Sequence, residues 1–367
     1  MFYHILYPLV RVHIIFNVFQ YITFRAIGAF VTALILCFIF GPKIINSLRK
    51  HQVTENINTL LPAAHMKKKG TPTMGGIIIG LGLIVSSLLW NNLTNPYVLI
   101  ALLVTLWLGG LGFLDDYLKN VRHLEQGLVE KYKIAGQLVL GILIAVTLYF
   151  GYQQSHLITY ISVPFLKDTS FSLGVLFIPF VALFITFYSN AVNLTDGLDG
   201  LAAGTIALVA FGLGVMAYVK GHIVIADYLK LEFIADAGEL TVFTTAIIGS
   251  ILGFLWFNIK PAQVFMGDTG ALSMGGVLAV MAILLKEEIF FVMIGLVFVV
   301  EAVSSLVQRY YYKHTRIKYG EGKRILLCAP LHHHYELKGW SENQIVIRFW
   351  IVTMLLTAIG LATLKLR

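Results

Sequence analysis

Polar and charged side chains gather in five short stretches of this chain, and two of these stretches are acidic. Asp115 and Asp116 are adjacent, and Asp268 stands in a Met-Gly-Asp-Thr-Gly string. Magnesium prefers oxygen ligands and is usually held by one or two carboxylates together with substrate phosphates. Acidic residues at the carboxyl end of a helix oppose its dipole, which favours a functional reading of Asp115 and Asp116. For Asp268 a simple turn aspartate is an equal alternative.

A third stretch carries polar residues at every third position. On a continuing helix they would form one polar ridge, whereas Asn, Asp and Gly in such a stretch also indicate a turn. Both interpretations stay open. The residues are Asn190, Asn193, Asp196 and Asp199.

The last two stretches are basic. Three consecutive histidines cannot all point at one metal ion, so phosphate contact or acid–base work fits them better than a zinc site, with ordinary interfacial histidines as the alternative. A run of three lysines either binds phosphate or anchors a loop by its charge. The residues are His332, His333 and His334, and Lys67, Lys68 and Lys69.

The composition places these stretches in a membrane protein. Hydrophobic residues make up 58% of the 367 and charged residues 13%, and the mean hydropathy is +0.81. A soluble domain carries about 25% charged residues. The net charge of +8 does not indicate nucleic acid, because the basic residues lie in loops between apolar runs. We therefore expect an all-α polytopic membrane protein that lies in a lipid bilayer and binds no nucleic acid.

Apolar runs close to the ~20 residues that cross a bilayer recur along the chain. Residues 1–24 are apolar but carry His4, Arg11 and His13, which predicts a segment lying in the membrane interface. No soluble domain interrupts the rest, so residues 1–367 are expected to form a single transmembrane domain, a bundle of about ten helices. The predicted spans are Ile27–Phe40, Gly75–Leu89, Tyr97–Leu114, Ile134–Phe150, Leu173–Tyr188, Leu201–Val219, Leu240–Phe257, Ala271–Leu285, Ile289–Val307 and Ile345–Leu364.

The loops between the spans alternate in charge. Numbered from the first span, the odd loops hold most of the 27 Lys and Arg residues. The positive-inside rule places these loops in the cytoplasm and both termini outside. All five polar stretches fall in odd loops, so we expect one site at the cytoplasmic face. A cleft that gathers so many aspartates suits an anionic substrate only with a bound cation and basic partners.

Two other classes of protein share this composition. A transporter or channel would place ionisable residues near the middle of its spans, whereas here they collect at one face. Glu301 is the acidic residue deep in a predicted span, where it either serves the function or bonds a neighbouring helix. A non-catalytic lipid-binding or scaffold protein gives no reason for an acidic cleft paired with histidines.

Five strings, in order along nearly the whole chain, resemble the signature strings of the polyprenyl-phosphate N-acetylhexosamine-1-phosphate transferases. The first and last are most similar to the branch that uses a muramoyl-pentapeptide donor. The strings are Gly70-Thr-Pro-Thr-Met-Gly-Gly76, Asp115-Asp116-Tyr117, Asn190-Ala-Val-Asn-Leu-Thr-Asp-Gly-Leu-Asp-Gly200, Phe265-Met-Gly-Asp268 and Ala329-Pro-Leu-His-His-His-Tyr-Glu336.

The resemblance implies a ten-helix, Mg²⁺-dependent enzyme of the bacterial inner membrane, usually a homodimer, with its active site at the cytoplasmic face. The donor would be UDP-N-acetylmuramoyl-pentapeptide and the acceptor undecaprenyl phosphate. The products would be undecaprenyl-diphospho-N-acetylmuramoyl-pentapeptide (lipid I) and UMP, in the first membrane step of peptidoglycan biosynthesis. A related UDP-N-acetylhexosamine-1-phosphate transferase is the nearest alternative enzyme.

The resemblance also implies roles for residues. Asp268 and Asp116 would hold Mg²⁺, and Asp115 would accept or position the proton of the lipid phosphate. Attack could be direct or could pass through an aspartyl-phosphate. The lysine that offsets phosphate charge is aligned as Lys68, with Lys69 as the alternative. His332, His333 and His334 would contact the phosphates or the muramoyl group. The implied substrate-binding residues are Asn190, Asn193, Asp196, Asp199, Asn258, Phe265 and Thr73.

Overall fold

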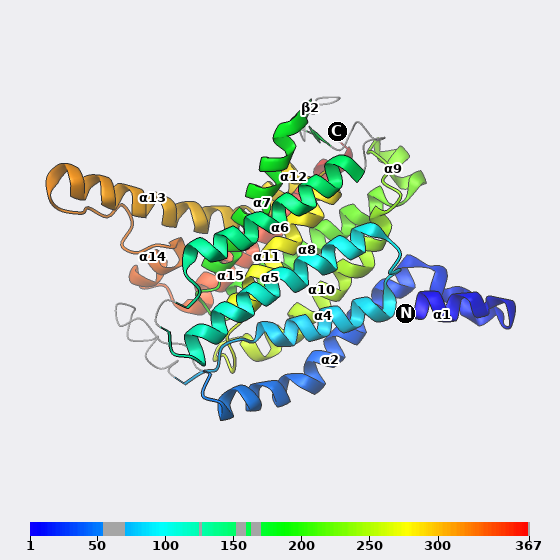
Figure 1. Ribbon diagram of the computed structural model, residues 1–367, viewed down its shortest axis with the longest axis horizontal. Coiled ribbons are helices and arrows are strands. Elements are labelled where there is room, and N and C mark those ends of the chain that lie inside the picture. Colours follow the sequence, from blue (N-terminus) through cyan, green and yellow to red (C-terminus); the bar gives the residue numbers. More distant parts are fainter. Residues whose placement is uncertain (54–69, 125–126, 152–158, 163–169, 366–367) are drawn as a thin grey trace.

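The long apolar runs of the sequence form helices that lie side by side in a bundle (Figure 1). The computed structural model describes residues 1–53, 70–124, 127–151, 159–162 and 170–365. The helices are α1 (Phe2–Leu6), α2 (Ile22–Lys50), α4 (Gly76–Trp90), α5 (Pro96–Asn120), α6 (Glu130–Gly151), α7 (Phe177–Thr195), α8 (Leu201–Lys220), α9 (Ile223–Leu229), α10 (Ala237–Asn258), α11 (Gly267–Leu284), α12 (Glu288–Ile294), α13 (Leu296–Tyr319), α14 (Leu331–Leu337) and α15 (Glu342–Ala362). The 3-10 segments are η1 (Tyr7–Arg11), η2 (Ile14–Gln20), η4 (Gly174–Leu176) and η5 (Thr363–Lys365), and an antiparallel pair joins β1 (Tyr160–Ser162) to β2 (Ser170–Ser172).

The prediction of an all-α polytopic membrane protein is confirmed. Among the described residues, eight helices are long and apolar enough to cross a membrane. The predicted span Ile289–Val307 is not one straight helix: it breaks at Gly295 into α12 and α13, which meet at a bend of 78°. Helix α4 has 15 residues, which is about 22 Å at 1.5 Å per residue. It is therefore shorter than the ~30 Å hydrocarbon core of a bilayer.

Helix α11 lies inside the bundle and is buried from Thr269 to Leu284 (Figure 1). It packs against α5, α7 and α4. A Cβ on Gly76 of α4 would lie 2.5 Å from the Cα of Gly270. A Cβ on Gly112 of α5 would lie 2.2 Å from the carbonyl oxygen of Asp268. Small residues let helices in a membrane approach this closely, so the amino end of α11 is held between α4 and α5.

Gly76→Ala is expected to destabilise the protein, because its Cβ would lie 2.1 Å from the backbone nitrogen of Gly270. Overpacking of this kind costs about 1–3 kcal/mol, occasionally more. A Cβ on Gly80, one turn further along the same helix, would meet nothing within 4 Å. Gly80→Ala is therefore the matched control. The measurement is the midpoint of thermal unfolding in detergent, and equal midpoints for the two variants would contradict the close approach of α4 and α11.

The segments that precede α4 and α11 run side by side. The N–H of Phe265 donates to the carbonyl of Pro72 at 2.8 Å, and the N–H of Gly75 donates to the carbonyl of Phe265 at 2.8 Å. The N–H of Gly76 donates to the carbonyl of Met266, also at 2.8 Å. Two strings separated by almost two hundred residues in the sequence therefore meet beside the amino end of α11.

The opposite end of the bundle carries its own polar contacts. The two terminal nitrogens of Arg25 lie 2.7 Å and 2.5 Å from the carboxylate of Glu239. From this end the short helices of residues 1–20 project sideways (Figure 1), with Val12, Ile14 and Ile15 exposed. An interfacial segment would present such a surface, and for residues 1–24 that interpretation stays a prediction.

Candidate active site

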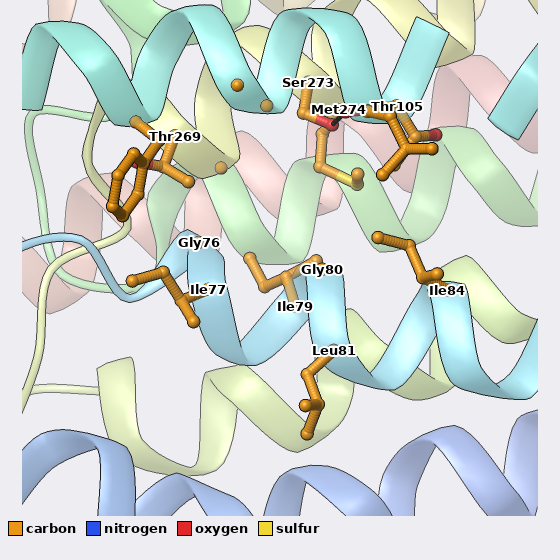
Figure 2. A pocket seen from close by; sticks show the side chains of 15 residues that line it. Gly76, Ile77, Ile79, Gly80, Leu81, Ile84, Thr105, Thr269, Ser273 and Met274 are labelled. Carbon is orange, nitrogen blue, oxygen red and sulfur yellow. Dashed lines mark hydrogen bonds between the residues drawn. The ribbon is translucent and has the colours of Figure 1, made fainter. Parts of the chain in front are cut away.

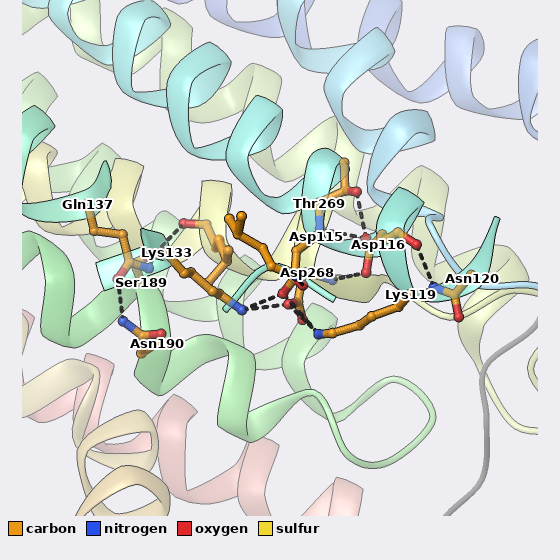
Figure 3. A network of polar contacts seen from close by, with 12 residues as sticks. Asp115, Asp116, Lys119, Asn120, Lys133, Gln137, Ser189, Asn190, Asp268 and Thr269 are labelled. Carbon is orange, nitrogen blue, oxygen red and sulfur yellow. Dashed lines mark hydrogen bonds and ion pairs between the residues drawn. The ribbon is translucent and has the colours of Figure 1, made fainter. Parts of the chain in front are cut away.

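Two carboxylates and two lysines form a cluster where α5, α6 and α11 meet (Figure 3). The Oδ2 of Asp115 lies 2.9 Å from Lys119 Nζ and 3.0 Å from Lys133 Nζ. The Oδ2 of Asp268 lies 3.2 Å and 2.5 Å from the same two nitrogens. Each lysine therefore bridges both carboxylates, and the cluster ties together three helices.

Asp116 binds the first turn of α11 (Figure 3). Its carboxylate accepts hydrogen bonds from the N–H of Asp268 at 3.2 Å and the N–H of Thr269 at 2.9 Å. It also accepts from the hydroxyl of Thr269 at 2.7 Å. The first turn of a helix has unpaired N–H groups, and its dipole favours negative charge. Asp116 thus caps α11 from a different helix and fixes where Asp268 stands.

Burial strengthens the attraction between the charged side chains of the cluster. The side chain of Asp115 is 2% exposed, that of Asp268 14% and that of Lys119 38%. Charges attract more strongly in a low-dielectric interior, and removing one partner of a buried pair costs about 3–5 kcal/mol. Asp268 and Lys119 are more accessible than Asp115, so an anionic substrate would reach them first.

The oxygen atoms of the cluster suit a hard divalent cation, with one restriction. A carboxylate offers about four lone-pair positions, and Asp116 already uses three of them on α11. The more exposed Asp268 is the better ligand. Within the described residues, no group of three or more His, Cys, Asp or Glu side chains is placed to hold a metal ion. Substrate phosphates would have to complete the ligand set, as they commonly do for magnesium.

Neutral hydrogen bonds continue between α6, α7 and α11 (Figure 3). Gln137 lies one turn beyond Lys133 on α6, and its Nε2 donates to Ser189 Oγ at 3.1 Å. Asn190 Nδ2 donates to Gln137 Oε1 at 2.8 Å, and Ser189 Oγ donates to the carbonyl of Leu272 at 3.0 Å. Asn190, a predicted substrate-binding residue, thus lies near the cluster, with its amide nitrogen bonded inside the protein.

The stretch with polar residues at every third position is a helix that ends in a turn, so each interpretation of it is right in part. Helix α7 runs through Asn190 and Asn193 to Thr195. Residues 196–200, called the 196–200 turn below, then lead into α8, with Gly200 at φ +81°. That φ lies in the left-handed region that glycine adopts without strain.

Two predicted substrate-binding residues hold the 196–200 turn in place. The N–H of Ala262 donates to the carboxylate of Asp199 at 3.1 Å, and the N–H of Asp199 donates to Glu342 at 2.9 Å. The N–H of Gly200 donates to Asn258 Oδ1 at 3.0 Å. Asp199 and Asn258 are both buried, so they hold the 196–200 turn in place from inside the protein.

The first two of the consecutive histidines each contact a carboxylate. His332 is buried, and its Nδ1 lies 2.9 Å from Glu301 Oε2. His333 Nδ1 lies 2.6 Å from Glu336 Oε2, three residues along the same short helix. The pair of His332 joins α14 to α13, whereas the pair of His333 stays within α14.

His334 has a different kind of partner. Its Nδ1 accepts a hydrogen bond from the N–H of Leu327 at 3.1 Å. Desolvation and the positive charge of Lys338 lower the pKa of His334 below its ordinary value. The lowered pKa favours the neutral ring, which is the form that can accept this bond.

The remaining predicted residues lie near the cluster or outside the described residues. A Cβ on Gly267 would lie 2.7 Å from Asp116 Oδ2 and 3.0 Å from Thr73 Oγ1, so Thr73 lies next to Asp116. Phe265 stands in the paired segment before α11. Lys68 falls in 54–69, outside the described residues.

Sequence reasoning missed two members of the cluster, Lys119 and Lys133, which it counted only as loop charges. Lys119 had a local signal, because it follows Asp115 by four residues and that spacing puts both on one helix face. Lys133 belongs to another helix, so only the packing of α6 against α5 and α7 reveals it.

An apolar groove lies beside Asp116, between α4, α5 and α11 (Figure 2). Its volume is about 380 Å³, and Leu106 and Phe113 are among the residues that line it. The hydroxyl of Thr269 in its wall is bonded to Asp116, and that of Ser273 donates to a backbone carbonyl at 3.1 Å. The groove therefore offers hydrocarbon surface that ends next to the polar cluster.

Residues 98–286 match the model of a protein family described as Glycosyl transferase family 4. Along 351 residues the chain is 48% identical to the phospho-N-acetylmuramoyl-pentapeptide-transferase of Chloroherpeton thalassium, covering 96% of this chain and 95% of that protein. It is 47% identical over 367 residues to the protein of the same name from Endomicrobium trichonymphae, and 46% identical over 367 residues to that of Desulforapulum autotrophicum, covering 100% of both chains in each case.

Proposed function

Because this chain belongs to glycosyl transferase family 4 and, within it, to the phospho-N-acetylmuramoyl-pentapeptide-transferases, we propose that it transfers phospho-N-acetylmuramoyl-pentapeptide from a UDP-linked donor to undecaprenyl phosphate. The products are lipid I and UMP, in the first membrane step of peptidoglycan biosynthesis. The observation that carries the proposal is the buried cluster of aspartates and lysines at one end of the spanning helices. There a water-soluble donor and a lipid acceptor can meet.

In the proposed reaction an oxygen of the acceptor phosphate attacks the β-phosphorus of the donor. A phosphorus–oxygen bond forms between them, the bond from the β-phosphorus to the bridging oxygen breaks, and UMP leaves with that oxygen. Phosphoryl transfer depends mostly on positioning and charge stabilisation. Lys119 and Lys133, held by Asp115 and Asp268, offset the negative charge on the reacting phosphates.

The surroundings of Asp115 support direct attack over an aspartyl-phosphate. One of its oxygens accepts the N–H of Leu128 at 2.8 Å, and the other lies between the two lysines. With its side chain 2% exposed, Asp115 is poorly placed to form a covalent bond to the donor. We assign it the positioning of the acceptor phosphate, through the lysines.

Magnesium is the proposed cofactor, held by Asp268 with Asp116 nearby. When bound, it would neutralise the diphosphate of the donor and polarise it for attack. At the other end of the donor, Asn193 and Asp196 would bind the uridine with Phe265 as a stacking partner. His333, His334 and Lys68 remain proposed contacts of the phosphates or the muramoyl group.

We place the site at the cytoplasmic face of the bacterial plasma membrane, with both termini outside. The charge distribution supports this orientation, because the loops at the catalytic end carry most of the basic residues. A UDP-linked donor is water-soluble, which also fits a site that opens toward the cytoplasm.

Detergent-purified protein supplied with undecaprenyl phosphate is expected to release UMP from UDP-N-acetylmuramoyl-pentapeptide but not from UDP-N-acetylglucosamine. Chelation of Mg²⁺ is expected to stop the release, because the donor phosphates would then lack their counter-charge. The measurement is UMP and lipid product by chromatography. Turnover of UDP-N-acetylglucosamine alone would reassign the donor, and full activity after chelation would overturn the metal assignment. Turnover of neither donor by folded protein would return a transporter to consideration.

A further inference from the structure

Glu301 and His332 form a pair that is sealed inside the protein. Glu301 lies in α13 and His332 in α14, and their side chains are 0% and 1% exposed. The carboxylate contacts His332 twice: the backbone N–H donates to Oε1 at 3.2 Å, and Nδ1 lies 2.9 Å from Oε2. Two contacts from one carboxylate fix both the backbone and the ring of His332.

The second ring nitrogen of His332 faces the 196–200 turn. It is buried and has no hydrogen-bond partner among the described residues. A Cβ on Gly197 would lie only 2.3 Å from this Nε2, so the edge of the ring lies directly against Gly197. A carboxylate on one nitrogen of an imidazole sets the tautomer and the orientation of the other.

Other residues of the turn are held by other contacts. Asp199 is bonded to Glu342 and Ala262, and Gly200 to Asn258. His332 adds a contact at Gly197, which these hydrogen bonds do not involve. Because Glu301 contacts both the backbone N–H and the ring of His332, the position of the turn depends on a residue of α13.

We propose that Glu301 is a positioning residue for the donor: through His332 it sets where the 196–200 turn lies, and with it Asp196 and Asp199. The proposal rests on the proposed function, which assigns the uridine end of the donor to this turn. It also gives a reason for a carboxylate buried in a spanning helix, where such a group is costly unless it serves a function.

The first test is Glu301→Gln, which keeps the size of the side chain and replaces one accepting oxygen by an NH₂ group. We expect the KM for the UDP-linked donor to rise about tenfold, as for loss of a hydrogen bond to a charged group. The KM for the lipid acceptor should change little, and the unfolding midpoint should stay above the assay temperature even though a buried charge is removed. The Kd for UMP, measured by titration calorimetry, should rise with the donor KM, because this readout needs no turnover.

His332→Asn completes a double-mutant cycle, since the Asn amide can replace Nδ1 but not Nε2. If Glu301 acts only through His332, the double variant should have the same donor KM as either single variant. The matched control is Glu288→Gln, which alters a buried carboxylate in α12. The neighbouring Glu287 pairs with Lys220 at the carboxyl end of α8, whereas the 196–200 turn precedes the amino end of that helix. Glu288→Gln should leave both the donor KM and the Kd for UMP unchanged.

The outcomes of these measurements distinguish a positioning role of Glu301 from a purely structural one. Coupled, non-additive increases in donor KM and UMP Kd support the positioning role. An unchanged donor KM and UMP Kd in Glu301→Gln, a lowered midpoint with normal kinetics, or additive effects in the double variant would overturn it, and Glu301 would then be only structural. Wild-type protein that binds neither UMP nor the donor would overturn the proposed function together with this one. If the wild type turns over and Glu301→Gln has the same donor KM and UMP Kd as the wild type, only the positioning role is rejected.

Discussion

Asp268→Asn is expected to lower UMP release by about 1000-fold or more, the scale of losing a principal charge-stabilising group. The change removes the charge that Lys119 and Lys133 share at 3.2 Å and 2.5 Å, and with it the most accessible carboxylate for a cation. The protein should still fold, because Asp116 accepts from the backbone N–H of residue 268, which Asn keeps. UMP release at saturating substrates and the unfolding midpoint are the two measurements.

Asp227→Asn is the matched control for this variant. Asp227 is an exposed aspartate in α9 at the other end of the bundle, so its neutralisation should leave turnover near the wild-type value. Wild-type turnover in Asp268→Asn would remove Asp268 from the reaction. Loss of turnover accompanied by an equal loss of folded protein would mean that the carboxylate is needed for folding instead.

Lys133→Met is expected to lower kcat by about 100-fold. The Met side chain keeps the length and apolar stem of Lys133 but leaves two buried carboxylates facing each other with one counter-ion fewer. Lys119→Met should have a smaller effect, about tenfold, because the Lys119 side chain is 38% exposed against 12% for Lys133 and solvent screens its charge more. Steady-state rates of UMP release measure both.

Lys131→Met tests whether any charge on this part of α6 matters. Lys131 is two residues before Lys133 but exposed, with its Nζ 4.9 Å from the centre of the Tyr132 ring. Its variant should be fully active. A loss of rate as large as that of Lys133→Met, or a larger loss in Lys119→Met than in Lys133→Met, would contradict the bridging role assigned to Lys133.

The sequence predicts the spans well because long apolar runs carry their own signal. The predicted span Leu201–Val219 is α8 to within one residue at each end. The break at Gly295 was not predictable in this way: both sides of it are apolar, so hydropathy is the same for one straight helix and for a bend of 78°. Tertiary packing decides between them.

Only those residues of the candidate site whose type is unusual in an apolar chain could be predicted from the sequence. Adjacent aspartates and a Met-Gly-Asp-Thr-Gly string stand out in an apolar chain, and the structure places Asp115, Asp116 and Asp268 together. The capping role of Asp116 and the bridging role of Lys133 depend on which helices touch. A single sequence carries no local record of such contacts.

The two lysines that pair with Asp115 are synthesised after it, Lys119 first and Lys133 next. Lys119 is four residues away on the same helix, so a nascent α5 carries a neutralising charge of its own, and a lone carboxylate near a bilayer would be costly. Lys133 follows with α6, but Asp268 arrives 149 residues after Lys119. The cap on Asp116 is equally late. A chain released by the ribosome before α11 therefore has the Asp115–Lys119 ion pair but lacks Asp268 and the cap on Asp116, so it has only part of the proposed reaction centre.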